Sequence, residues 1–218
     1  MAGVRDFVEL SAKRNRGWPW PEDSWGLTPM YGEGGWCRAC GVPRRTQCGS
    51  LVLQRKSFKI HGAWLPYWQY DAICLEAGLA DEIARRFRVE LIDVEWHASS
   101  PGQARQIVAP TVGGAWFDAD ELRKRTVAAH GSPGATCATC GTWRWFPLAF
   151  EPIPPLTKET LSPLREVPEF EEFDVVASPE WFGDGWNAFR QILVRRELAS
   201  MIVAASPRDF RIVEPSWA

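Results

Sequence analysis

The sequence Cys37-Arg38-Ala39-Cys40-Gly41 returns one hundred positions later as Cys137-Ala138-Thr139-Cys140-Gly141. A Cys-x-x-Cys-Gly turn places both sulfurs on the same side of a tight bend, and its glycine permits the positive φ that aims an amide at a sulfur. Two such turns supply four soft ligands, the complement of a closed tetrahedral zinc site. The repeat therefore predicts a structural zinc bound by Cys37, Cys40, Cys137 and Cys140.

The fold must bring the two turns together, because 96 residues separate Cys40 from Cys137. Closing such a loop costs about 4 kcal/mol, whereas a structural zinc contributes on the order of 10–16 kcal/mol in small peptides. Two alternatives are dithiol–disulfide redox chemistry and independent reduced thiols. Redox Cys-x-x-Cys pairs normally open a helix. Here Pro43 lies two positions after Gly41, and Thr142-Trp143 follows Gly141, which disfavours a helix start. We expect a structural metal that leaves no open position for a substrate water.

The remaining thiols and imidazoles are scattered along the chain. Cys48 lies near the first turn and is either an inert thiol or a substitute ligand, and Cys74 is far from both turns. His130 precedes Cys137 by seven positions, whereas His61 and His97 have no such neighbour. We find no Ser-His-Asp or Cys-His arrangement, phosphate loop or His-Glu-x-x-His pattern, so we predict no catalytic residues and expect that the protein is not an enzyme.

Composition is that of an ordinary globular protein, with 45% apolar and 24% charged residues. We predict an α+β fold with antiparallel or mixed sheets and a few short helices around a zinc-ribbon-like four-cysteine site. Residues 1–150 would form the zinc-ribbon-containing region. Residues 151–218 would add a proline-rich strap and a β-α-β segment packed on it as one unit. The sequence contains no run of about 18 apolar residues, so we predict no membrane span. The first sixteen residues lack the apolar core of a secretory signal, so we expect a reducing cytoplasm.

The apolar pattern and turn residues also predict individual elements. Extended segments are expected at Ser50–Trp64, Val89–Val94, Ala104–Ala109, Thr142–Phe150, Phe173–Val176 and Phe210–Val213. Helices are expected at Asp71–Phe87, Asp118–Ala128 and Asn187–Ala199.

Charge is unevenly distributed although the net charge is only −2. The segment Glu166–Asp184 contains seven acidic residues and no Lys or Arg, which indicates either a solvated face or a patch that attracts a basic partner. The thirteen tryptophans either bury area in a loop-rich fold or anchor a protein partner. The candidate partner-binding residues are Glu169, Glu171, Glu172, Asp174, Glu180, Trp181, Asp184 and Trp186.

The paired motifs Cys37–Gly41 and Cys137–Gly141 resemble those of the double-CXXCG-motif proteins, a paralogous family of social soil bacteria. The likeness extends to the aromatic strand after the second pair and to the short C-terminal helix and strand. It implies a cytoplasmic immunity protein of a swarming-inhibition toxin–immunity pair, which binds and neutralises a toxin delivered by a sibling cell.

Two other functions compete with this expectation. A zinc-ribbon adaptor for nucleic acid or the transcription machinery would use the basic first sixty residues, but a pI near 6.0 disfavours it. A Cys-x-x-Cys thiol oxidoreductase would show a dithiol–disulfide couple and no bound metal. The oligomeric state and the identity of the toxin do not follow from the sequence.

Overall fold

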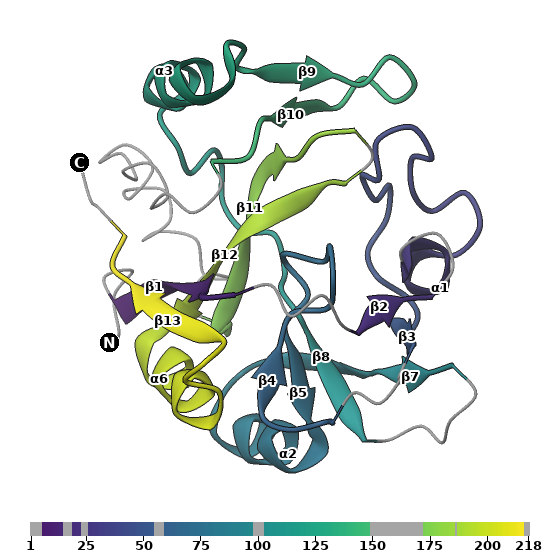
Figure 1. The fold of residues 1–218 in the computed structure, drawn as a ribbon, viewed down its shortest axis with the longest axis vertical. Coiled ribbons are helices and arrows are strands. Elements are labelled where there is room, and N and C mark those ends of the chain that lie inside the picture. The colour runs from purple at the N-terminus through teal and green to yellow at the C-terminus, as the bar shows by residue number, and fades with distance from the viewer. Residues whose placement is uncertain are drawn as a thin grey trace.

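The computed structural model describes residues 6–14, 19–22, 26–54, 59–97, 103–148, 172–185 and 187–215. In these ranges the chain forms three sheets and four helices, and sheet pairing is both antiparallel and mixed. The predicted α+β class is confirmed (Figure 1).

The largest sheet has six strands in the order β13-β1-β12-β11-β10-β9. All its pairs are antiparallel except β10 with β11, which run parallel through Trp145 and Phe182. Strands from residues 1–150 and from residues 151–218 therefore share one sheet. Its strands are β1 (Phe7–Ala12), β9 (Gly134–Thr136), β10 (Trp143–Trp145), β11 (Val175–Phe182), β12 (Phe189–Arg195) and β13 (Phe210–Val213).

Two smaller sheets lie beside it. The four-stranded sheet, in the order β4-β5-β8-β6, is antiparallel, and the three-stranded sheet, in the order β2-β3-β7, is mixed. Their strands are β4 (Ala63–Trp64), β5 (Cys74–Glu76), β6 (Glu90–Asp93), β8 (Ala104–Val108), β2 (Trp20–Pro21), β3 (Val52–Gln54) and β7 (Glu95–Trp96). The helices are α1 (Leu27–Tyr31), α2 (Ala77–Arg86), α3 (Ala119–His130) and α6 (Arg196–Ala205).

The main core joins the six-stranded sheet to the four-stranded sheet. Val8 of β1 and Val194 of β12 lie in one buried cluster with Ile83 of α2, Ile107 of β8 and Ile202 of α6. Helices α2 and α6 lie together at one end of the molecule, away from α3 and the β9–β10 hairpin (Figure 1). In the described ranges, no helix has both the length and the apolar character needed to span a bilayer.

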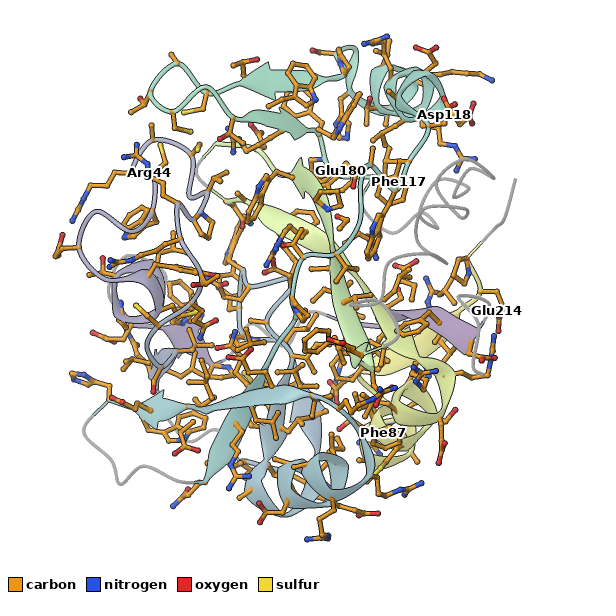
Figure 2. The ribbon with its side chains drawn as sticks, turned by 180° about the vertical axis from the view of Figure 1, so that it is seen from behind. Arg44, Phe87, Phe117, Asp118, Glu180 and Glu214 are labelled. Carbon is orange, nitrogen blue, oxygen red and sulfur yellow. The ribbon has the colours of Figure 1, made fainter. Side chains whose placement is uncertain are left out.

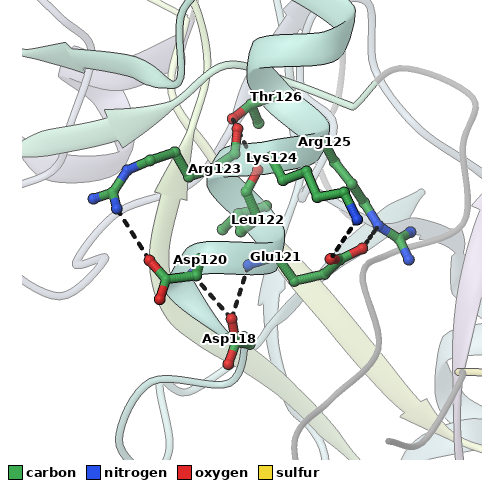
Figure 3. A network of polar contacts seen from close by, with 8 residues as sticks. All are labelled: Asp118, Asp120, Glu121, Leu122, Arg123, Lys124, Arg125 and Thr126. Carbon is green, nitrogen blue, oxygen red and sulfur yellow. Dashed lines mark hydrogen bonds and ion pairs between the residues drawn. The ribbon is translucent and has the colours of Figure 1, made fainter.

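Helix α3 follows the local signals of its sequence. The Asp118 carboxylate accepts hydrogen bonds from the amides of Asp120 and Glu121 at 2.9 and 2.8 Å, so it caps the first turn. Ion pairs Arg123–Asp120 and Arg125–Glu121 run along its surface (Figure 3). The helix leads, through Gly131 at φ 75°, into β9.

Two predicted helices need correction. The segment Asn187–Ala199 is not one helix, because Phe189–Arg195 forms strand β12 and α6 begins only at Arg196. Strand β12 is hydrogen-bonded to β1 on one side and β11 on the other, so sheet pairing overrides the local helical pattern. Within Asp71–Phe87 the helix begins at Ala77, since Cys74–Glu76 pairs with β4 and β8.

The other element predictions agree with the structure in place, if not always in length. Strands β6, β8 and β13 confirm three of the predicted extended segments, and α3 confirms the helix predicted at Asp118–Ala128. In the described parts of Ser50–Trp64 and Thr142–Phe150, the strands that form are the short β3 and β4 in the first and β10 in the second. The short strand predicted at Phe173–Val176 is the start of the longer β11.

Candidate metal centre

The first cysteine pair lies on a short hairpin stabilised by backbone hydrogen bonds. Trp36 and Pro43 form an antiparallel bridge, and the Cys37 amide donates to the Val42 carbonyl at 2.8 Å. The Gly41 amide returns to the Cys37 carbonyl at 2.8 Å with φ 77°, a conformation that favours glycine.

The second pair repeats this geometry at the tip of the β9–β10 hairpin. The Cys137 amide donates to the Thr142 carbonyl at 2.9 Å, and the Gly141 amide donates to the Cys137 carbonyl at 2.8 Å with φ 75°. Gly134, at the start of β9, approaches β10 so closely that a Cβ there would lie 2.1 Å from the Arg144 carbonyl oxygen. The two hairpins meet at one corner of the molecule (Figure 1).

The four predicted cysteines form a single cluster. All four sulfur atoms lie within 4.8 Å of one another. The Sγ atoms of Cys37 and Cys137 are 3.9 Å apart, and those of Cys40 and Cys140 are 3.5 Å apart. Zn–S bonds of about 2.3 Å in a tetrahedron require S–S separations of about 3.8 Å. Each of these cysteines is a free thiol, so the donor set fits a tetrahedral metal.

Burial and local hydrogen-bond donors shift the pKa values of three of the four thiols. Cys37 and Cys40 are fully buried, Cys137 is nearly so and Cys140 is partly exposed. Burial raises the pKa of Cys40. The Thr142 hydroxyl, 3.4 Å from Cys140 Sγ, lowers the pKa of Cys140 to about 6, and backbone amides lower that of Cys137. The second hairpin is therefore disposed to supply thiolates, the form that binds metal.

Arg144 adjoins the cluster, and our sequence reasoning did not single it out. Its side chain comes from β10 and is only 7% exposed. Nη1 donates to the Gly185 carbonyl at 2.6 Å and lies 3.3 Å from the Cys40 carbonyl. Three other arginines lie within or just after the first Cys-x-x-Cys-Gly turn, Arg38, Arg44 and Arg45. All three are exposed; Arg38 pairs with Glu33 and Arg45 donates to the Tyr31 carbonyl (Arg44 is labelled in Figure 2).

The remaining thiols and imidazoles lie outside the cluster. Cys48 is exposed and Cys74 is buried in β5. His61 lies 3.4 Å from Glu76, His130 contacts the Pro147 carbonyl at 2.8 Å, and His97 is exposed. Among the residues that the structure describes, the four cysteines of the repeated motif are the one group of this kind brought together.

The candidate residues of the partner surface fall in different environments. Glu169, Glu171 and Trp186 lie outside the described residues. Glu172 and Asp184 are exposed. The other three candidates, Asp174, Glu180 and Trp181, make contacts within the fold.

Asp174 and Glu180, which we expected on a partner surface, are bonded inside the fold. Asp174 is 5% exposed, pairs with Arg195 and accepts from the Arg88 amide at 2.7 Å. Glu180 accepts from the amides of Trp116 and Phe117 at 2.6 and 3.2 Å, and Figure 2 shows it beside Phe117. Burial raises the pKa of Glu180.

Trp181 belongs to the surroundings of the cysteine cluster. It packs against the buried group formed by the cysteines and Val42. The Arg190 guanidinium lies 5.1 Å from the centre of its ring, within the range of a cation–π contact.

A hollow with an aromatic wall was also missed by the sequence reasoning. A cavity of about 370 Å³ has Trp68, Tyr70, Phe189 and Asp184 among its lining residues; we call this the aromatic hollow. Trp68 and Tyr70 are 42% and 44% exposed. Their rings meet edge to face at 6.4 Å, and Tyr70 meets Phe189 at 5.2 Å.

The backbone of this wall is unusual at one position. Trp68 has φ 64°, which is rare for a bulky residue and costs on the order of 1–3 kcal/mol. In the sequence, this aromatic wall is indicated only by residue type, since Trp and Tyr are frequent at binding hot spots.

Comparison with known proteins adds no relative: no family model, curated protein or solved structure matches the chain. The geometry of the cysteine cluster is therefore the basis of the functional proposal.

Proposed function

We propose that the four cysteines bind a structural zinc and that the protein is a non-enzymatic, cytoplasmic immunity protein that binds and neutralises a cognate toxin from sibling bacteria. The observation that carries the proposal is the convergence of four sulfur atoms from two hairpins one hundred residues apart.

Zinc is the metal that best suits this donor set. Four thiolates in tetrahedral arrangement favour zinc or iron, and zinc is the usual ion where no redox chemistry is needed. Cys37, Cys40, Cys137 and Cys140 would complete the coordination shell, so the ion would supply rigidity and no Lewis-acid site. Its binding energy exceeds the loop-closure cost of about 4 kcal/mol.

An inhibitor needs a contact surface, and the aromatic hollow offers one, with the exposed acid Asp184 and the bases Arg14 and Arg190 among its lining residues. Trp68 and Tyr70 offer a large contact area, and Asp184 adds a negative charge. A toxin with a basic surface, such as a nuclease, fits this chemistry because opposite charge accelerates association. The immunity role itself derives from the resemblance of the paired motifs.

The test joins metal analysis to toxin neutralisation. Purified protein should contain one zinc per chain, and it should co-purify with the toxin encoded by the neighbouring gene and abolish its toxicity on co-expression. Cys40→Ser should lose the zinc and reduce protection, whereas Cys48→Ser, at an exposed cysteine outside the cluster, should do neither. If zinc-loaded protein gives no protection against the toxin, the immunity role is rejected and the proposed metal centre is unaffected.

The adaptor function is a second candidate because Arg38, Arg44 and Arg45 are exposed around the first hairpin. Nucleic-acid binding that weakens steeply with salt and disappears in an Arg44→Ala/Arg45→Ala variant would favour it. A reversible dithiol–disulfide couple in metal-free protein, with no zinc in the purified chain, would favour the oxidoreductase instead.

A further inference from the structure

Arg144 is a buried cation whose described contacts leave its charge unbalanced. The residue is 7% exposed, and both of its hydrogen bonds go to neutral backbone carbonyls. No carboxylate of the described residues lies within ion-pair distance of it, and its buried Nε has no hydrogen-bond partner among them. Burying an unpaired guanidinium is costly, so a compensating negative charge is expected close by.

The four-cysteine cluster would supply that charge when it holds zinc. Four thiolates around Zn²⁺ carry a net charge of about −2, and this charge is itself expensive to bury. Arg144 reaches the backbone of Cys40 from a position four residues after Cys140. A loaded centre and the guanidinium therefore relieve each other's desolvation cost.

The same side chain connects three segments of the molecule. It projects from β10, which carries the second hairpin, and contacts the Cys40 carbonyl of the first hairpin. Its shortest bond, 2.6 Å, goes to Gly185 in the turn between β11 and β12. Gly183 and Asp184 of this turn line the aromatic hollow.

We propose that Arg144 is a positioning residue that couples metal at the four cysteines to the turn at 183–185, and through it to the aromatic hollow. The inference rests on the proposed zinc site, but not on the immunity role. Metal loading fixes the guanidinium between the hairpins, and the guanidinium then fixes the turn that carries Asp184.

Two substitutions separate charge from hydrogen bonding. Arg144→Gln removes the charge, and zinc affinity measured against a chromophoric chelator should fall 10- to 100-fold, as for other groups that support metal ligands. Arg144→Lys keeps the charge but cannot reach two carbonyls as a guanidinium does, so its zinc affinity should stay close to that of the unmodified protein. Arg45→Gln is the matched control, because it removes an exposed charge nearer in sequence to Cys40.

Hydrogen exchange tests the coupling itself. Removing zinc from the unmodified protein should accelerate amide exchange in residues 183–190, with little change in α2, which lies at the other end of the molecule. In both Arg144 variants the turn should exchange rapidly with zinc bound. If both variants fail to fold, the comparison of zinc-loaded and zinc-free unmodified protein still tests whether metal and turn are coupled, and equal exchange of the turn in the two states would overturn the proposal.

The outcomes are distinct. An unmodified protein that binds no zinc rejects the proposed metal centre. Zinc affinity equal in Arg144→Gln and Arg45→Gln, or exchange that rises equally in the turn and in α2, overturns the role of Arg144 while leaving the metal centre intact.

Discussion

Loss of one cysteine ligand should weaken the fold by the free energy of zinc binding. Cys40→Ser removes a ligand, so the folded state no longer gains the energy of binding zinc, which the unfolded chain does not bind as a formed site. That energy is RT ln(1 + [Zn]/Kd), or about 4 kcal/mol when free zinc is about 1,000 times Kd. For a chain of 218 residues, a loss of about 4 kcal/mol lowers the melting temperature by roughly 10 °C.

The assay is thermal and urea unfolding of zinc-loaded protein. Unmodified protein treated with a chelator should unfold at the midpoint of Cys40→Ser, because both lack the bound zinc. Cys48→Ser is the control, since Cys48 is exposed and outside the cluster. Equal midpoints for the two serine variants, with no shift on chelation, would refute the reasoning.

Three further predictions follow from single contacts. Gly134→Ala places a Cβ about 2.1 Å from the Arg144 carbonyl oxygen and should destabilise the fold by about 2 kcal/mol in urea unfolding, whereas Gly114→Ala, with open space around it, should not. Burial raises the pKa of Glu180 in the fold above its unfolded value near 4.5, so its ionisation opposes folding. Stability should fall as pH rises from about 4.5 through the folded pKa, and Glu180→Gln should remove that part of the slope in unfolding titrations; an unchanged slope would contradict it. Asp184→Lys should slow toxin association and Trp68→Ala should speed dissociation in surface-binding kinetics, while Glu82→Lys on α2 should change neither rate.

The sequence predicted those features whose stabilising contacts lie within a few residues of each other. The Cys-x-x-Cys-Gly turns form as expected because a glycine at positive φ and the hairpin hydrogen bonds lie within a few residues of each other. Helix α3 was found for the same reason, since its Asp118 cap and first-turn acids are close in sequence.

Features that depend on distant pairing were missed. Phe189–Arg195 has the apolar spacing of a helix, yet Leu193 and Val194 pack into two different buried clusters on opposite faces of a central strand. Asp174 belongs to an acidic run in the sequence, but antiparallel pairing brings β12 alongside it and so places Arg195 against its carboxylate. Runs of charge therefore predicted a surface at positions that sheet register had buried.

Arg144 illustrates a different limit. It stands between Trp143 and Trp145, and strand alternation alone says that it faces away from both. Whether Arg144 on that face of β10 meets solvent or the cysteine cluster depends on how the first hairpin packs against β10. No local sequence pattern encodes that packing. An arginine inside an aromatic strand next to a metal-binding motif is the signal that could have raised the question.

The size of the buried clusters predicts how the fold responds when the metal is removed. The main core contains apolar residues from α2, α6 and the two larger sheets. Among the described residues, the cluster at the hairpins contains the four cysteines and Val42, with Trp181 and Ala188 packed against it. So little apolar area cannot hold two hairpins together unaided. The metal-free protein should therefore keep its main core and open at the corner where the hairpins meet, which is also the corner that Arg144 links to the aromatic hollow.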